Sequence, residues 1–180
     1  LQFCDSEKGI FAMGQTEFAN LSIFNFVEQN FMADAEYFIC DDLLKEWADH
    51  IAISENKIIF YHSKHNTTQF SASAFQDIVG QAQKNLGNLS PQAYQLQEKR
   101  DTWNSTYNND GINTNINRLR KGNNIDDAIS LYQSSINNPH FKGEVHLVID
   151  FISRNTLEQN LNNLKDGVPF ARRSETIQIL

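Results

Sequence analysis

Two strand-like runs joined by only two residues constrain the fold of this chain more than any other feature. Residues 47–54 (WADHIAIS) alternate between large apolar side chains and smaller or polar ones. Residues 57–64 (KIIFYHSK) form a second, strongly β-prone run. Glu55 and Asn56 between them give a connection of the length that is typical of a tight β-hairpin. The sequence therefore predicts two adjacent antiparallel strands.

The hairpin predicts which residues of its two strands lie opposite each other. Across a two-residue turn, opposing positions add up to about 111, which places Asp49 near His62. Lys64 then lies a little beyond Asp49. We expect the side chains of Asp49 and Lys64 on the same side of the sheet, near one of its ends.

The remaining periodic segments predict an α/β fold with a mixed central sheet flanked by helices. Residues 143–153 (GEVHLVIDFIS) are almost continuously apolar, which is typical of a central strand. Helices are expected at 16–31, at 74–89 after a cap at Ser71 or Ser73, and at 154–167, and a further strand is expected at 35–40.

Residues 91–136 are expected to form a helical insertion within a single domain that spans 1–180. Pro91 favours the first turn of a helix, and residues 126–136 predict a shorter helix. The Asn- and Gly-rich stretch 108–124 between them predicts a loop. The chain lacks a starting Met and ends on an apolar run, so we expect it to be a domain of a longer protein.

Composition excludes several classes of protein. The chain is 40% apolar with 13 Phe, which is enough for one sizeable core and argues against disorder. It has no run of 18 apolar residues, so no membrane span is predicted, and its first residues do not resemble a secretory signal. Cys4 and Cys40 are too few for a disulfide framework, and with His62 and His65 they lack the spacing of a zinc site. A reducing cytoplasm is the expected compartment.

Charge is distributed unevenly along the chain. Residues 1–63 carry 3 Lys/Arg and 11 Asp/Glu, whereas residues 64–180 carry 12 and 11. An acidic region beside a more basic one suits a metal ion at one place and phosphates at another, although solvated surfaces explain the same count. The candidate phosphate-binding residues are Lys84, Lys99, Arg100, Arg118, Arg120 and Lys121.

An acidic cluster precedes the hairpin, and a lone lysine ends it. Asp41, Asp42, Glu46 and Asp49 offer carboxylates, and Lys64 offers a cation. A divalent ion held by carboxylates polarises a phosphate and activates water, while a lysine stabilises the negative charge that develops. A metal-dependent phosphodiesterase needs both elements.

The chain resembles the PD-(D/E)XK nuclease superfamily, in particular its Mrr-like restriction endonucleases. The expected αβββαβ order over residues 18–90 and 143–165 is similar to the core of that superfamily. Asp49 matches its first acidic position and Lys64 its lysine, and His62 stands where most members have an acidic residue. The resemblance implies a DNA-cleaving domain of a bacterial restriction or defence protein. Helicase or ATPase domains in the same chain, and a second copy of the chain, are the partners it implies.

The resemblance also assigns roles to residues. Asp49, together with Glu46 or Asp42, is expected to hold Mg²⁺ or Mn²⁺. His62 belongs to the expected catalytic set because it occupies the position of a ligand. Gln81 is expected to position substrate or water, and Lys84 lies three residues further along the same helix.

Other interpretations of the same residues stay open. The fold could be a nuclease that has lost its activity at His62 and that serves as a DNA- or protein-interaction domain. Asp49 and Lys64 could form a structural salt bridge in place of a catalytic site. His62 and Lys64 also match the start of the phospholipase D motif, but Gln69 stands where that motif has its Asp.

Overall fold

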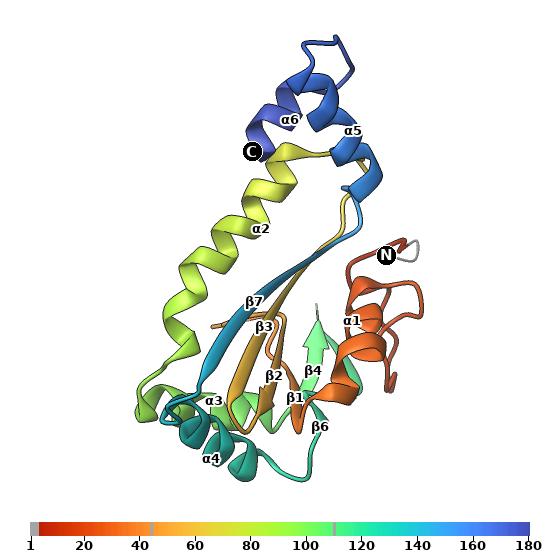
Figure 1. The fold of residues 1–180 in the computed structure, drawn as a ribbon. Coiled ribbons are helices and arrows are strands. Elements are labelled where there is room, and N and C mark those ends of the chain that lie inside the picture. The colour runs from red at the N-terminus through yellow and green to blue at the C-terminus, as the bar shows by residue number, and fades with distance from the viewer. Residues whose placement is uncertain (1–3, 44, 110) are drawn as a thin grey trace.

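The computed structural model describes residues 4–43, 45–109 and 111–180. Within these ranges the chain is an α/β protein with a mixed five-stranded sheet and a small two-stranded one (Figure 1). The α/β class predicted from the sequence is confirmed. The elements are α1 (Ile23–Phe31), η1 (Met32–Asp34), β1 (Tyr37–Cys40), β2 (His50–Ser54), β3 (Lys57–Lys64), α2 (Ala72–Asn85), η2 (Leu86–Leu89), α3 (Ala93–Trp103), β4 (Thr106–Asn109), β5 (Ile112–Asn117), β6 (Leu119–Lys121), α4 (Ile125–Ile136), β7 (Lys142–Ile149), α5 (Arg154–Lys165) and α6 (Arg173–Ile179).

The central sheet has the strand order β6-β1-β2-β3-β7. Strands β1, β2 and β3 form an antiparallel meander, and β6 pairs antiparallel with the free side of β1. Strand β7 pairs parallel with β3, which requires the long crossover through α2 and the segments that follow it. The expected succession of helix, three strands, helix, strand and helix is present, with further elements between α2 and β7. Strand β7 lies at the edge of the sheet, so the prediction that it is a central strand is wrong.

The β2–β3 hairpin has the predicted register. Ser54 pairs with Lys57 across the two-residue turn, and His50 pairs with Tyr61 at the other end. Beyond His50 the pairing shifts by one residue, because the amide of Asp49 donates at 3.1 Å to the carbonyl of Tyr61, which already pairs with His50. Asp49 therefore lies beside the last residues of β3, as the sequence predicts.

Helices cover both faces of the sheet (Figure 1). Helix α1 packs on one face through Ile23 and Val27, against a cluster that contains Ile59. Its first turn is capped by Ser22, whose hydroxyl accepts from the amide of Asn25 at 3.1 Å. Helices α3 and α4 cover the other face, and their apolar side chains pack against those of Ile51, Ile53, Ile58 and Phe60.

The insertion is not wholly helical, so that part of the prediction is wrong. Residues 91–136 contain α3 and α4, but also β4, β5 and β6. Along β5, Thr114 and Ile116 are buried while Asn113, Asn115 and Asn117 are exposed. This two-residue alternation is the signature of a strand with one buried face, and a high asparagine content does not prevent it. Strand β6 then extends the central sheet, so this segment belongs to the core architecture.

The carboxylate of Asp41 joins the insertion to the central sheet. Asp41 is completely buried directly after β1. It accepts hydrogen bonds from Lys99 Nζ at 2.8 Å and from Trp103 Nε1 at 2.7 Å, both from α3. It also accepts from the backbone amide of Trp47 at 2.7 Å, which fixes the loop between β1 and β2. Burial raises the pKa of Asp41 and lowers that of Lys99, because leaving water penalises both charged forms.

The Asp41–Lys99 pair predicts a large loss of stability when one partner alone is removed. Lys99→Met should lower the free energy of unfolding by about 3–5 kcal/mol, because it leaves a buried carboxylate without its counter-charge. Chemical denaturation measures this change. Adding Asp41→Asn to Lys99→Met should restore part of the loss, and Lys84→Met on the exposed side of α2 is the matched control. A Lys99→Met protein as stable as the wild type would show that Asp41 is not the anchor of this region.

Candidate metal centre

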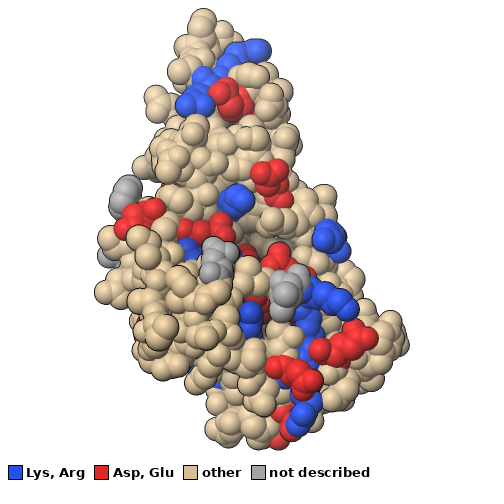
Figure 2. Space-filling model, turned by 180° about the vertical axis from the view of Figure 1, so that it is seen from behind, with Lys and Arg blue, Asp and Glu red and all other residues tan. Residues whose placement is uncertain are grey.

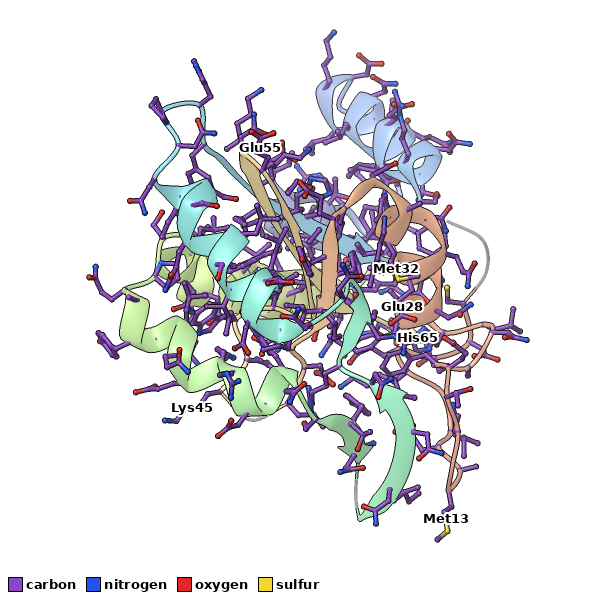
Figure 3. The ribbon with its side chains drawn as sticks, turned by 90° about the horizontal axis from the view of Figure 1, so that it is seen from below. Met13, Glu28, Met32, Lys45, Glu55 and His65 are labelled. Carbon is purple, nitrogen blue, oxygen red and sulfur yellow. The ribbon has the colours of Figure 1, made fainter. Side chains whose placement is uncertain are left out.

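Charged residues from distant segments meet at one end of the central sheet. Because β1 and β2 are antiparallel and β3 and β7 are parallel, the end of β1, the start of β2 and the ends of β3 and β7 share one edge. Asp42, Asp49, Lys64 and Asp150 come from these four places. In Figure 3 the hairpin turn at Glu55 lies far from His65, the residue that follows β3. The topology thus separates this edge from the hairpin turn.

Three carboxylates converge at this edge. One oxygen each from Asp42, Glu46 and Asp49 lies within 4.8 Å of the others, so the three could hold a metal ion. Asp42 and Asp49 are buried, and Glu46 is half-buried. The acidic cluster expected from the sequence therefore exists in space, except for Asp41, whose carboxylate is fully occupied by the contacts with α3 and the β1–β2 loop.

Hydrogen bonds fix each carboxylate through one of its two oxygens. Asp49 Oδ2 accepts from the amide of Ser63 at 2.6 Å, and Glu46 Oε2 accepts from the amide of Leu43 at 2.9 Å. Asp42 Oδ2 accepts from the hydroxyl of Tyr107 at 2.5 Å. No donor from the described part of the chain contacts the second oxygen of any of the three. Oriented carboxylates with an oxygen to spare suit a hard cation such as Mg²⁺, Mn²⁺ or Ca²⁺.

The electrostatics of the cluster favour a cation. Burial raises the pKa of Asp49 well above its ordinary value, and the charge of Asp42 raises it further. Burial and Asp42 also raise the pKa of Tyr107, so that its hydroxyl remains a donor. Carboxylates this close together repel one another when ionised, and a positive charge between them relieves the repulsion.

The lysine that contacts this cluster is Lys8, which sequence reasoning missed. Its ammonium lies 2.7 Å from Asp42 Oδ2. Lys8 belongs to the N-terminal segment, far from the hairpin in sequence, and no motif points to it. Lys64 is the last residue of β3, and the regular pairing of β2 with β3 ends at His50 and Tyr61, one residue before Asp49. Within the described ranges, no carboxylate lies within 4.0 Å of the Lys64 ammonium, so the alternative of an Asp49–Lys64 salt bridge does not hold.

His62 is a buried, neutral side chain outside the cluster. It is 3% exposed, and burial lowers its pKa to about 4. Its Nε2 has no hydrogen-bond partner in the described structure. A histidine this deeply buried argues against the phospholipase D interpretation, which requires an accessible imidazole as nucleophile.

Gln81 and Lys84 lie in the second half of α2. Both are exposed on α2 and line an open cavity of about 410 Å³, together with Lys45, Glu46 and Trp47. Glu46 therefore joins this cavity to the acidic cluster. Figure 2 shows the face opposite to that of Figure 1, on which acidic and basic side chains gather around a hollow.

Most of the expected phosphate-binding cations are occupied within the protein. Lys99 is bound to Asp41, and Arg118, 3% exposed, donates to the carbonyls of Cys40 and Asp42 at 3.1 and 2.7 Å. These two residues support the fold and are not available to phosphates, which corrects the prediction.

The other cations of that set also have partners inside the chain. Arg120 pairs with Glu28 at 2.6 Å, and its side chain is 8% exposed. Lys121 donates to the carbonyl of Ala33 at 2.7 Å. Arg100 pairs with Asp126 on the surface. Of the six residues proposed from the charge count, Lys84 is exposed and has no partner within the described ranges.

Comparison with protein-family models, with curated proteins and with solved structures found no match. The resemblance to the PD-(D/E)XK superfamily therefore rests on the residues and on the order of the elements. Among the described helices, none combines the length and the apolar character that a membrane crossing requires.

The lowered pKa of His62 predicts that the folded protein loses stability as the pH falls. Its folded pKa of about 4 lies below the value of about 6.5 for an unfolded chain, so the unfolded chain binds the proton first as the pH falls. Stability should therefore decrease by about 3 kcal/mol as the pH falls from about 6.5 to 4. His62→Gln should lack this component in urea titrations across that range, and His140→Gln, at an exposed position, is the control. An identical pH dependence in wild type and His62→Gln would contradict the assignment.

Proposed function

We propose that the protein hydrolyses DNA phosphodiester bonds with the help of a divalent metal ion. The observation that carries the proposal is the convergence of Asp42, Glu46 and Asp49 at the sheet edge where β3 ends on Lys64. The acid on one strand of a hairpin and the lysine at the end of the other match the resemblance described above. Because no family model or solved structure matches, the site geometry is the support for this function.

Each residue has a defined part in this proposal. Mg²⁺ or Mn²⁺, when bound, supplies Lewis acidity and lowers the pKa of water. Asp42, Glu46 and Asp49 hold the ion through one carboxylate oxygen each. Lys64, at the end of β3, stabilises negative charge on the phosphate. Gln81 positions the substrate from α2.

The substrate backbone is proposed to lie along the cavity beside Glu46. Lys84 comes from α2, and Lys45 comes from the β1–β2 loop, beside α3 (Figure 3). Asn85 and Asn88 line the same cavity and offer amide groups. Two lysines and several carboxamides form a suitable surface for phosphate and sugar oxygens.

A second candidate is a DNA-binding domain without catalysis. Two observations favour it: His62 stands outside the carboxylate cluster, and the Lys64 ammonium lies beyond ion-pair distance of the carboxylates within the described ranges. In this case the cation at the cluster would be structural, and the lysine-lined cavity would still bind DNA.

A nuclease assay separates the two candidates. Wild-type protein with Mg²⁺ or Mn²⁺ should cleave plasmid or linear DNA, and EDTA should stop the reaction. Lys64→Ala should lower the rate by ~10²-fold or more, with a nearly unchanged melting temperature, because Lys64 forms no ion pair with the described residues. Asp49→Asn should abolish cleavage, while its amide oxygen still accepts from Ser63. Wild-type protein that binds DNA and does not cut it with either metal would favour the non-catalytic domain.

Removal of Lys45 and Lys84 should change the salt dependence of DNA binding. Replacing both by alanine should weaken binding on all sequences alike and reduce the slope of log K against log[salt] by about 1–2, since up to two phosphate contacts are lost. Fluorescence anisotropy at several salt concentrations, with Asp49→Asn protein and added Mg²⁺, measures this without cleavage. Lys142→Ala plus Lys165→Ala, two exposed lysines outside this cavity, form the matched control. An unchanged slope would place the DNA elsewhere.

A further inference from the structure

We propose that Lys8 is a built-in counter-cation of the carboxylate cluster, and that a divalent metal ion displaces it from Asp42. This inference rests on the proposed metal centre and concerns how metal binding to that centre is regulated. The Lys8 ammonium lies 2.7 Å from Asp42 Oδ2 and 3.7 Å from Glu7 Oε1. The Asp42 side chain is 4% exposed and that of Lys8 is 19% exposed. The protein thus already holds one positive charge at the cluster that could take a metal ion.

The backbone that carries Lys8 is fixed to the start of α1. The amide of Ile23 donates to the carbonyl of Ser6, and the amide of Phe24 donates to the carbonyl of Glu7, both at 3.0 Å. These carbonyls accept from two of the first amides of the helix, which have no partner within it. Lys8 directly follows this pair of contacts, so its position is set even though the segment is not part of a helix or strand.

A glycine fixes the other side of Lys8. Gly9 adopts a φ of +86°, and a Cβ at this position would lie 2.1 Å from the Cβ of Ala19. The chain therefore passes so close to Ala19 that only glycine fits. Because the backbone is held on both sides, displacement of Lys8 is a movement of its flexible side chain and not of the segment.

The geometry makes the ammonium and a metal ion competitors. Both need the carboxylate of Asp42, and two positive charges within a few ångströms repel each other strongly in a half-buried site. The four-carbon stem of Lys8 lets the ammonium leave without breaking the backbone contacts. In the position where it contacts Asp42, the ammonium also lies 5.2 Å from the centroid of the Phe24 ring.

Competition couples metal binding to the exposure of the Lys8 amine. By thermodynamic reciprocity, a contact that must break when the metal binds also weakens the binding of the metal. In the metal-free protein, Lys8 offsets the repulsion between Asp42 and its acidic neighbours. The cluster therefore keeps its shape without an ion and binds one less tightly than the bare carboxylates would.

Acylation of lysines in wild-type protein tests the displacement directly. An amine-reactive acetylating reagent, with and without Mn²⁺, should label Lys8 several-fold faster when the metal is present, as read by peptide mass spectrometry. Lys142 serves as the reference in the same sample, because its exposed side chain lies at the start of β7 and its labelling should not change. Labelling of Lys8 that is unchanged or slower with Mn²⁺ would overturn the inference.

Calorimetric titration with Mn²⁺ provides the second test. Lys8→Met should bind the ion about tenfold more tightly than wild type, because no ammonium has to leave. Lys142→Met should bind like wild type, and Asp49→Asn should lose binding. Circular dichroism in EDTA checks that each variant is folded, and Lys8→Arg, which keeps the charge, replaces Lys8→Met if that variant does not fold. With Lys8→Arg, the inference requires affinity within about twofold of wild type, and tighter binding would overturn it.

Two negative outcomes are distinguishable. Equal or weaker Mn²⁺ binding by Lys8→Met than by wild type overturns the role of Lys8 and leaves the metal centre in place. Absence of Mn²⁺ binding by wild type and by Lys8→Met alike overturns the metal centre, and with it the proposed function and the inference.

Discussion

The rest of the site depends on the hydrogen bonds that the buried carboxylate of Asp41 accepts. It receives hydrogen bonds from Lys99 and Trp103 on α3 and from the amide of Trp47, so it ties the insertion and the β1–β2 loop to the end of β1. The loop from 42 to 49 carries all three candidate metal ligands. The anchor fixes the backbone of this loop at Trp47, between Asp42 and Asp49.

Neighbouring aspartates show how partners decide the role of identical side chains. Both oxygens of Asp41 are occupied by donors that include a lysine, and this carboxylate is structural. Asp49 accepts from one amide, that of Ser63, and the largest effect of a charge on its pKa comes from another carboxylate, Asp42. A buried carboxylate left short of positive partners lowers stability, which makes such a group a candidate for binding or reacting with another molecule. Stability is thus assigned to Asp41, and the proposed function to Asp49, at the same end of the sheet.

Local patterns allowed much of the fold to be predicted, because they act over few residues. The two-residue turn sets the register of the hairpin, which correctly placed Asp49 beside the end of β3, and the acidic cluster followed from it. Contacts between distant segments left no such pattern. Neither the approach of Lys8 to Asp42 nor the pairing of β6 with β1 could be predicted from spacing. A charge count could not show that Lys99 and Arg118 are buried, because their partners come from another part of the chain.

The parallel pairing of β3 with β7 has a consequence for how the chain reaches its native state. Strand β7 can join the sheet only after the whole segment from α2 to α4 has been brought back alongside β3, whereas β1, β2 and β3 need only short loops to meet. During folding, β3 therefore exposes an unpaired edge of apolar sequence for longer than any other strand of the meander. Such edges pair readily with other chains. The yield of refolding should thus depend on protein concentration and on the speed of this crossover more than on native stability.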